Sequence, residues 1–215
     1  MNTETIDNIK MIAETAREFA EKNIRPNIME WDESQTFPKD LFHELGEMGF
    51  MGIVIPEQYG GSGLGYHEYV TILDEISQVD PSIGLSVAAH NSLCTGHIMT
   101  FGNEEQKLRL LPRMAEGGLA SLVITEPTAG SDATGMKTTF TPDGDSIIMN
   151  GSKIFISNGD VSDLYIVFGK WSEIAGDKEA ITAVVLEKGA PGFSVTGTED
   201  KMGTRASGTA SLAFD

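Results

Sequence analysis

One stretch marks the point where this sequence changes from helical to strand-like patterning: Leu122-Val123-Ile124-Thr125-Glu126-Pro127-Thr128-Ala129-Gly130-Ser131-Asp132-Ala133-Thr134-Gly135. Its apolar beginning is typical of a strand, which Pro127 ends because proline has no N–H group for the ladder. The small, hydroxyl-rich turn that follows leaves backbone N–H groups open, and Gly130 has no side chain to block a close approach. We therefore expect a phosphate-bearing ligand near Ser131 and a hydroxyl contact from Thr125.

The two acidic residues of this stretch have simpler interpretations than catalysis. Glu126 stands beside Pro127, and we expect it to form a salt bridge or to stabilise the turn. Asp132 is expected to tie the turn together by accepting backbone N–H bonds, as aspartate side chains often do.

The composition limits the classes of protein that this chain can belong to. Its 215 residues carry 32 acidic and 15 basic side chains, a net charge of -17, which disfavours nucleic acid as a partner. The single cysteine, Cys94, rules out an internal disulfide and fits a reducing compartment. No apolar run approaches the length of a membrane span, and the N-terminus resembles neither a signal nor a transit peptide. We expect a soluble protein of the bacterial cytoplasm without membrane contact.

Residues 1–118 are expected to form an N-terminal all-α helical bundle. Apolar residues recur at helical spacing in segments 6–19, 28–31, 38–48, 66–79, 82–101 and 104–115. Segment 82–101 is apolar around most of its circumference, which is typical of a central buried helix. The glycine cluster at 60–65 matches neither a dinucleotide-binding nor a Walker A pattern, so we interpret it as a tight loop. The four histidines lack metal-ligand spacing, and we expect no metal site.

Residues 119–215 are expected to form a second domain, built from β-strands. Strand patterns occupy 121–125, 137–141, 146–150, 152–157, 164–170, 180–186, 193–196 and 209–214, with turns such as Asn150-Gly151 between them. No intervening run is long or helical enough for a parallel crossover, which favours an antiparallel barrel or sandwich. The fold class is therefore α+β with two domains. The last strand ends with the chain at Asp215, and we expect the chain to stop before its domain is finished.

The stretch 125–135 resembles the first sequence signature of the acyl-CoA dehydrogenase family of flavoproteins. Five further segments match that family in the same order: Pro-Glu-Gln-Tyr-Gly-Gly at 56–61, Phe-Gly-Asn-Glu-Glu-Gln-Lys at 101–107, Asn-Gly-Ser-Lys at 150–153, Ile-Ser-Asn-Gly at 156–159 and Lys-Met-Gly-Thr-Arg-Ala-Ser at 201–207. Together the matches cover nearly the whole chain. Val123 is a minor departure, because the family usually carries a small residue there.

The resemblance implies a three-domain protein that binds FAD between its middle β-domain and a C-terminal four-helix domain. Carried over by position, the Thr125 hydroxyl and nearby N–H groups would bind the flavin pyrimidine edge, and Ser131 would lie near the pyrophosphate. Phe155 stands where many members carry Trp and keeps a stacking surface, whereas Ser157 keeps a hydroxyl near flavin N5. The cofactor contacts implied are Leu122, Ile124, Thr125, Gly130, Ser131, Phe155, Ile156 and Ser157.

The resemblance also implies a reaction, the α,β-dehydrogenation of an acyl-CoA thioester to the trans-2-enoyl-CoA. A carboxylate removes the α-proton, a hydride passes to flavin N5, and an electron-transfer flavoprotein takes the electrons. Ser131, Asn91 and Leu93 are the residues implied in acyl-CoA binding. No catalytic residue is assigned within this chain, because the usual glutamate belongs to the C-terminal domain and is expected beyond Asp215. The complete protein is expected to be a homotetramer or homodimer.

Three other interpretations remain open on the sequence. The chain could belong to a family member with altered chemistry, either an oxidase that uses O2 or a flavin-dependent monooxygenase. It could also be a binding module that holds flavin or CoA without catalysis. The length and branching of the acyl group are not encoded in the motifs, since the missing domain fixes part of the acyl pocket.

Overall fold

The computed structural model describes residues 3–176 and 179–215 and divides into two compact units. The helical unit contains the residues up to Leu119 together with the segment Asp200–Ser207. The β unit contains Ala120–Glu199 and Gly208–Asp215. The chain therefore returns to the helical unit from the β unit, which the sequence does not indicate. In the described chain no helix is long and apolar enough to cross a membrane.

The helices of the first unit confirm the predicted helical region. They are α1 (Thr3–Phe19), α2 (Ile28–Ser34), α3 (Lys39–Glu47), α4 (Tyr66–Val79), α5 (Pro81–Ala88), α6 (Gly96–Phe101) and α7 (Glu104–Ala115). Their buried faces form the core, which includes Phe42 and Leu45 of α3, Ile72 and Ile76 of α4 and Ile83 and Val87 of α5. The helix predicted over 82–101 consists of α5 and α6 joined by a π-helical turn at Ala89–Thr95.

Local hydrogen bonds explain where two of these helices begin. The Asp80 carboxylate accepts the Ser82 N–H at 2.7 Å, and Pro81 occupies the first turn of α5. At α7, the Asn103 side chain accepts the Gln106 N–H and the Gln106 side chain accepts the Asn103 N–H, each at 2.9 Å. This reciprocal capping box satisfies two N–H groups that a helix start otherwise leaves unpaired.

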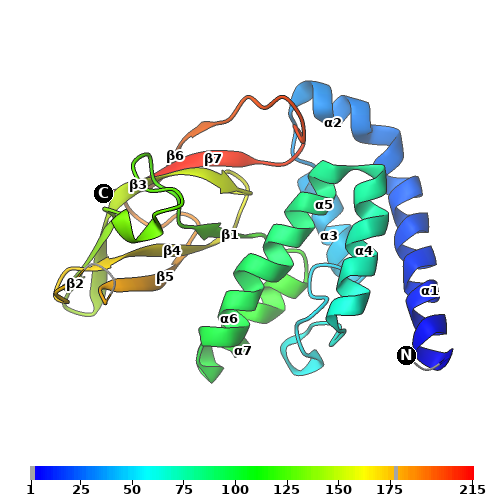
Figure 1. Ribbon diagram of the computed structural model, residues 1–215, viewed down its shortest axis with the longest axis horizontal. Coiled ribbons are helices and arrows are strands. Elements are labelled where there is room, and N and C mark those ends of the chain that lie inside the picture. The colour runs from blue at the N-terminus through cyan, green and yellow to red at the C-terminus, as the bar shows by residue number, and fades with distance from the viewer. Residues whose placement is uncertain (1–2, 177–178) are drawn as a thin grey trace. The chain divides into compact units, whose positions relative to one another are not determined.

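The β unit is a strongly curled sheet, and the predicted α+β fold class is confirmed (Figure 1). Its strands are β1 (Ala120–Val123), β2 (Thr139–Asp143), β3 (Ser146–Ser157), β4 (Leu164–Trp171), β5 (Ile181–Glu187), β6 (Phe193–Thr198) and β7 (Thr209–Phe214). The order is β1-β4-β2-β3-β7-β6, and β5 pairs with β4. Side chains from its inner face form a core that includes Val123, Phe140, Tyr165 and Leu212.

The sheet is mixed rather than antiparallel throughout, which corrects the sequence-based expectation. Strands β1 and β2 both run parallel to β4, whereas β2–β3, β3–β7, β4–β5 and β6–β7 are antiparallel. A parallel pair needs a long connection, usually a helix. Here the β2–β3 hairpin lies in the chain between β1 and β4, so other strands of the sheet supply the connection.

The turn predicted at Asn150-Gly151 is wrong, because both residues lie inside the continuous strand β3. Asn150 pairs with Thr139 on one side, and Gly151 pairs with Phe214 on the other. A Cβ atom on Gly151 would lie 2.4 Å from the Thr138 hydroxyl. The glycine therefore allows two backbone segments to approach closely, a role that isolated glycines take within strands.

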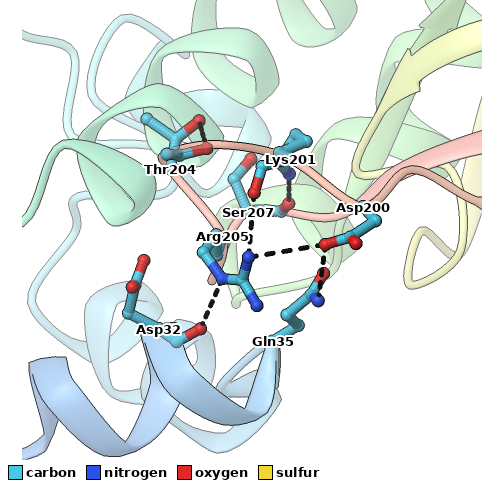
Figure 2. A network of polar contacts seen from close by, with 8 residues as sticks. Asp32, Gln35, Asp200, Lys201, Thr204, Arg205 and Ser207 are labelled. Atoms are coloured by element: carbon cyan, nitrogen blue, oxygen red, sulfur yellow. Dashed lines mark hydrogen bonds and ion pairs between the residues drawn. The ribbon is translucent and has the colours of Figure 1, made fainter.

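Segment 200–207 is held within the helical unit by the Arg205 side chain (Figure 2). Its guanidinium donates to the Asp32 carbonyl at 3.0 Å and to the Lys201 carbonyl at 3.0 Å, and it forms an ion pair with Asp200 at 3.4 Å. The Gln35 amide donates to the same Asp200 carboxylate at 2.9 Å. Arg205 thus joins the segment to the end of α2.

Candidate flavin-binding surface

A buried ion pair lies beneath the stretch that carries the first sequence signature. The Lys153 ammonium group of β3 lies 2.9 Å from the Glu126 carboxylate, and both side chains are buried. The same ammonium donates to the Ile124 carbonyl at 2.8 Å. Lysine and glutamate are almost never fully buried unless they are paired, so this contact is a specific feature of the turn.

The Glu126 carboxylate also accepts hydrogen bonds from the residues that follow the turn. It accepts the Lys137 N–H at 2.6 Å, the Thr138 N–H at 3.0 Å and the Thr138 hydroxyl at 2.6 Å. Burial alone would raise the pKa of Glu126, but these hydrogen bonds, with Lys153, outweigh burial and lower the pKa to about 2. Glu126 is therefore a structural carboxylate, which confirms the interpretation from its position in the sequence.

Two segments far apart in the chain lie side by side at this surface. The Ile154 N–H donates to the Thr125 carbonyl at 2.9 Å, and the Ser121 hydroxyl donates to the Ser157 carbonyl at 2.8 Å. These bonds join β1 and its following turn to the last residues of β3. The structure thus brings together two groups of predicted flavin contacts: Leu122, Ile124 and Thr125 in the first, and Phe155, Ile156 and Ser157 in the second.

A β-bulge in β3 decides which of its side chains face outward. The register against β7 shifts between Lys153 and Ile156, and Phe155 has a φ of 57°. Without the bulge, strand alternation would bury Phe155 with Lys153; instead, Ile156 is buried and Phe155 is 59% exposed. A bulky residue in the left-handed region is strained, and such strain concentrates at functional sites.

The turn itself presents an open backbone at Gly130. Gly130 and Ser131 are exposed, whereas Leu122, Ile124 and Thr125 are partly buried. Gly130 does not adopt a positive φ, and an added Cβ atom would meet no described atom within 4 Å. Neither backbone conformation nor internal packing therefore requires a glycine here. A ligand that approaches the backbone would require one, so the residues present fit a bound cofactor.

Asp132 ties the turn together through a different partner from the one expected. Its carboxylate accepts the Thr134 hydroxyl at 2.6 Å, and its backbone carbonyl accepts the Gly135 N–H at 3.1 Å. The short 3₁₀ turn at Ala133–Gly135 is closed by these contacts.

The two predicted acyl-CoA contacts of the helical unit, Asn91 and Leu93, lie in the π-helical turn and have different surroundings. Asn91 is buried; its amide donates to the Phe50 and Val87 carbonyls and accepts the Ile53 N–H. These bonds make Asn91 a brace for the loop that follows α3. Leu93 is 47% exposed, so its side chain is open to contact. Substrate binding by either residue stays a prediction.

Lys153 and Thr138 are the structural residues that sequence reasoning did not assign. The signal for Lys153 was weak: it follows Met149 at a spacing of four, which places both on the inner face of a regular strand. Nothing in the sequence pairs it with Glu126, because 26 intervening residues separate the two. Among the residues that the structure describes, no three potential metal ligands gather into a site.

Comparison with known proteins supports the same interpretation. Residues 7–118 match the family model for the acyl-CoA dehydrogenase N-terminal domain, and residues 121–215 match that for the middle domain. An acyl-CoA dehydrogenase of Bacillus subtilis is 39% identical over 206 residues, covering 95% of this chain and 54% of that protein. The mitochondrial isovaleryl-CoA dehydrogenase of Pongo abelii is 39% identical over 210 residues, covering 96% and 50%. The chain thus spans about half the length of these relatives.

Solved structures share the fold over the full chain. A structure described as the electron transferring flavoprotein of Acidaminococcus fermentans has a TM-score of 0.95 at 42% identity, covering all of this chain and 57% of the other. Butyryl-CoA dehydrogenase from Megasphaera elsdenii has a TM-score of 0.93 at 36% identity, with the same coverage. Glutaryl-CoA dehydrogenase from Mycobacterium smegmatis in complex with FADH2 has a TM-score of 0.90 at 31% identity, covering 100% and 53%. The chain belongs to the acyl-CoA dehydrogenase family, of which it carries the N-terminal and middle domains.

Proposed function

We propose that this chain supplies the N-terminal and middle domains of an FAD-dependent acyl-CoA dehydrogenase that oxidises an acyl-CoA thioester to the trans-2-enoyl-CoA. The observation that carries the proposal is the meeting of the two signature segments, joined by the 2.9 Å bond between Ile154 and Thr125. The relative solved with FADH2 supports the choice of cofactor. The half-length match to the relatives makes the activity a property of the complete protein.

The residues of this surface have distinct roles in the proposed site. Bound FAD would supply the redox chemistry, as the acceptor of the hydride that leaves the substrate β-carbon. Thr125 and the open backbone of the turn donate hydrogen bonds, Phe155 offers an aromatic face, and Ser157 offers a hydroxyl. Ser131, exposed at the turn, binds the pyrophosphate or the acyl-CoA. Together they would hold the cofactor in place and keep water from its ring.

The base that removes the α-proton is proposed to lie outside these 215 residues. Glu126 cannot act as this base, because its carboxylate is held by Lys153, Thr138 and the Lys137 N–H. A group with a pKa of about 2 is also a weak proton acceptor at neutral pH. We propose a glutamate of the following segment for this role, an electron-transfer flavoprotein as the electron acceptor, and a homo-oligomer as the complete assembly.

The test is the spectrum of the protein expressed from its complete gene. We expect a yellow protein whose flavin is bleached by an acyl-CoA without oxygen and reoxidised by an electron-transfer flavoprotein. Thr125→Ala and Ser157→Ala should each shift the reduction potential or the reduction rate of the flavin. The shift should correspond to about 1–3 kcal/mol, the free energy of a lost buried hydrogen bond. Thr15→Ala on α1, whose hydroxyl bonds the Met11 carbonyl, is a matched control that should leave the flavin unchanged.

Two results would contradict the proposal. A complete protein that is folded but holds no flavin would rule out the cofactor assignment. Rapid bleaching followed by reoxidation in air, without a protein acceptor, would assign the chain to an oxidase instead.

A further inference from the structure

The Lys153 side chain lies in an environment that is costly for a charge. Its side chain is fully buried, and burial lowers the pKa of the ammonium while Glu126 opposes that shift. A buried ion pair often contributes less to stability than well-packed apolar side chains of the same volume would. A role in stability alone therefore gives little reason for a lysine at this position.

The contacts of Lys153 suggest what the charge does. Its ammonium group binds the Ile124 carbonyl at 2.8 Å and thereby turns this carbonyl toward the interior. The peptide bond between Ile124 and Thr125 is trans, so its N–H points away from its C=O. Fixing the Ile124 carbonyl inward therefore fixes the Thr125 N–H toward the opposite, outer side.

The next peptide is fixed as well. The Thr125 carbonyl accepts the Ile154 N–H at 2.9 Å, so neither peptide flanking Thr125 is free to rotate. A cation on one end of a peptide group also polarises it, because hydrogen bonds in a low-dielectric interior strengthen one another. The Thr125 N–H is thus both oriented and made a stronger donor.

We propose that Lys153 is a positioning residue for the flavin: through the Ile124–Thr125 peptide it aims and strengthens the Thr125 N–H as a donor to the ring edge that gains negative charge on reduction. This inference rests on the proposed function, because it requires a flavin on this surface. Glu126 is the counterion that keeps Lys153 charged and in place, so the pair as a whole is neutral.

The proposal predicts opposite effects for the two members of the pair. Glu126→Gln leaves the positive charge of Lys153 uncompensated, which favours the reduced, more negative flavin. Lys153→Met leaves the negative charge of Glu126 uncompensated and releases the Ile124 carbonyl. Both changes disfavour the reduced flavin. An uncompensated charge acts on the flavin through space in these same directions, so the net-neutral double variant isolates the effect that passes through the Ile124–Thr125 peptide.

The first experiment measures the midpoint potential of the bound flavin in the complete protein. We expect Glu126→Gln to raise the potential and Lys153→Met to lower it. Each should change the ratio of affinities for reduced over oxidised flavin at least tenfold, about 30 mV for a two-electron couple. The matched control is Glu75→Gln, which alters the Arg17–Glu75 ion pair of the helical unit and should leave the potential unchanged.

The double variant Glu126→Gln/Lys153→Met covers the case in which Lys153→Met alone does not fold, because it leaves no buried charge. The double variant lacks the donor to the Ile124 carbonyl, so its flavin potential should lie below that of the wild type. The potential of Glu126→Gln should lie above that of the wild type. Equal potentials in the double variant and the wild type would overturn the proposal. Shifts of the same direction in Glu126→Gln and the double variant would overturn it too.

A second experiment needs no cofactor and separates this inference from the proposed function. In the 215-residue chain, the amide proton of Thr125 is followed by nuclear magnetic resonance in the wild type and the double variant. We expect a shift of the Thr125 amide resonance and at least tenfold faster hydrogen exchange of the Ile154 amide in the double variant. If both are unchanged, Lys153 does not orient this peptide and the inference fails, whether or not flavin binds. If they change but the complete protein binds no flavin, the proposed function fails, and with it the role toward flavin.

Discussion

At the scale of single residues, Phe155 shows how a local conformation can oppose the usual preference of an amino acid. Its φ of 57° lies in the left-handed region, where an L-residue costs about 1–2 kcal/mol relative to its normal conformations. Glycine avoids this cost because it has no Cβ atom. The side chain gains little from burial, since it is 59% exposed.

We therefore predict an inverted order of stability for two variants at this position. At a regular strand position, a glycine variant is less stable than the alanine variant by about 0.5–1 kcal/mol. At Phe155, the variant Phe155→Gly should be more stable than Phe155→Ala by about 1 kcal/mol, because only glycine relieves the bulge. Urea unfolding of the two variants measures this difference. Ile148 of the same strand, where the register with β2 is unbroken, provides a control pair in which the alanine variant should be more stable than the glycine variant. A Phe155→Gly variant less stable than Phe155→Ala would show that the bulge is not strained.

At the scale of elements, the connection between β6 and β7 is the unexpected feature of the fold. Segment 200–207 leaves the β unit and belongs to the helical unit, where Arg205 donates to the Asp32 carbonyl in the last turn of α2. Two non-glycine residues of this contact region, Gln35 and Thr204, have positive φ angles of 53° and 51°. The contact thus holds both the end of α2 and the tip of the connection in uncommon conformations.

Removal of the Arg205 guanidinium should destabilise the helical unit. Arg205→Ala loses charged hydrogen bonds to the Asp32 and Lys201 carbonyls, and we expect a loss of about 2 kcal/mol in unfolding free energy. Arg25→Ala is the matched control, because the Arg25–Glu21 pair is an exposed pair one helical turn apart. Because solvent screens an exposed pair, Arg25→Ala should cost clearly less stability than Arg205→Ala. The measurement is urea unfolding followed by helical circular dichroism, and equal losses in the two variants would contradict this role of Arg205.

At the scale of the whole molecule, the dependence of stability on pH tests the buried Glu126–Lys153 pair. The folded-state pKa of Glu126 is about 2, below its value of 4.5 without these contacts. The stability that this group contributes is therefore fully present above pH 4.5 and is lost as the pH falls through 2. The chain carries 32 acidic side chains in all, so only a comparison of variants isolates Glu126.

We predict that wild type and Glu126→Gln differ most above pH 5 and converge toward pH 2. The reason is that the wild-type carboxylate loses its charge there and becomes similar to the neutral glutamine. Chemical unfolding at several pH values from 7 to 2 measures the difference in unfolding free energy. A difference that stays constant over this range would show that Glu126 does not titrate with a lowered pKa.

The sequence by itself determined the broad organisation of this protein. Helical periodicity predicted α4 and α7 at their observed bounds, and strand alternation predicted β7, because these patterns depend on neighbours only three or four residues away, or two in a strand. The ordered motifs placed the chain in its family, and the composition of the turn at 125–135 indicated a ligand surface. These signals are local, so they can be read without the fold.

Only the tertiary structure decided which distant residues meet. The continuous strand through Asn150-Gly151, the parallel pairs beside β4 and the return of segment 200–207 all depend on partners far along the chain. The same holds for Lys153, whose partners are not defined until β3 is placed beside Ile124 and Glu126. The position of a residue within a strand determines which face of the sheet its side chain occupies. A buried charge also needs a partner that offsets the loss of hydration, and only the folded chain brings that partner close.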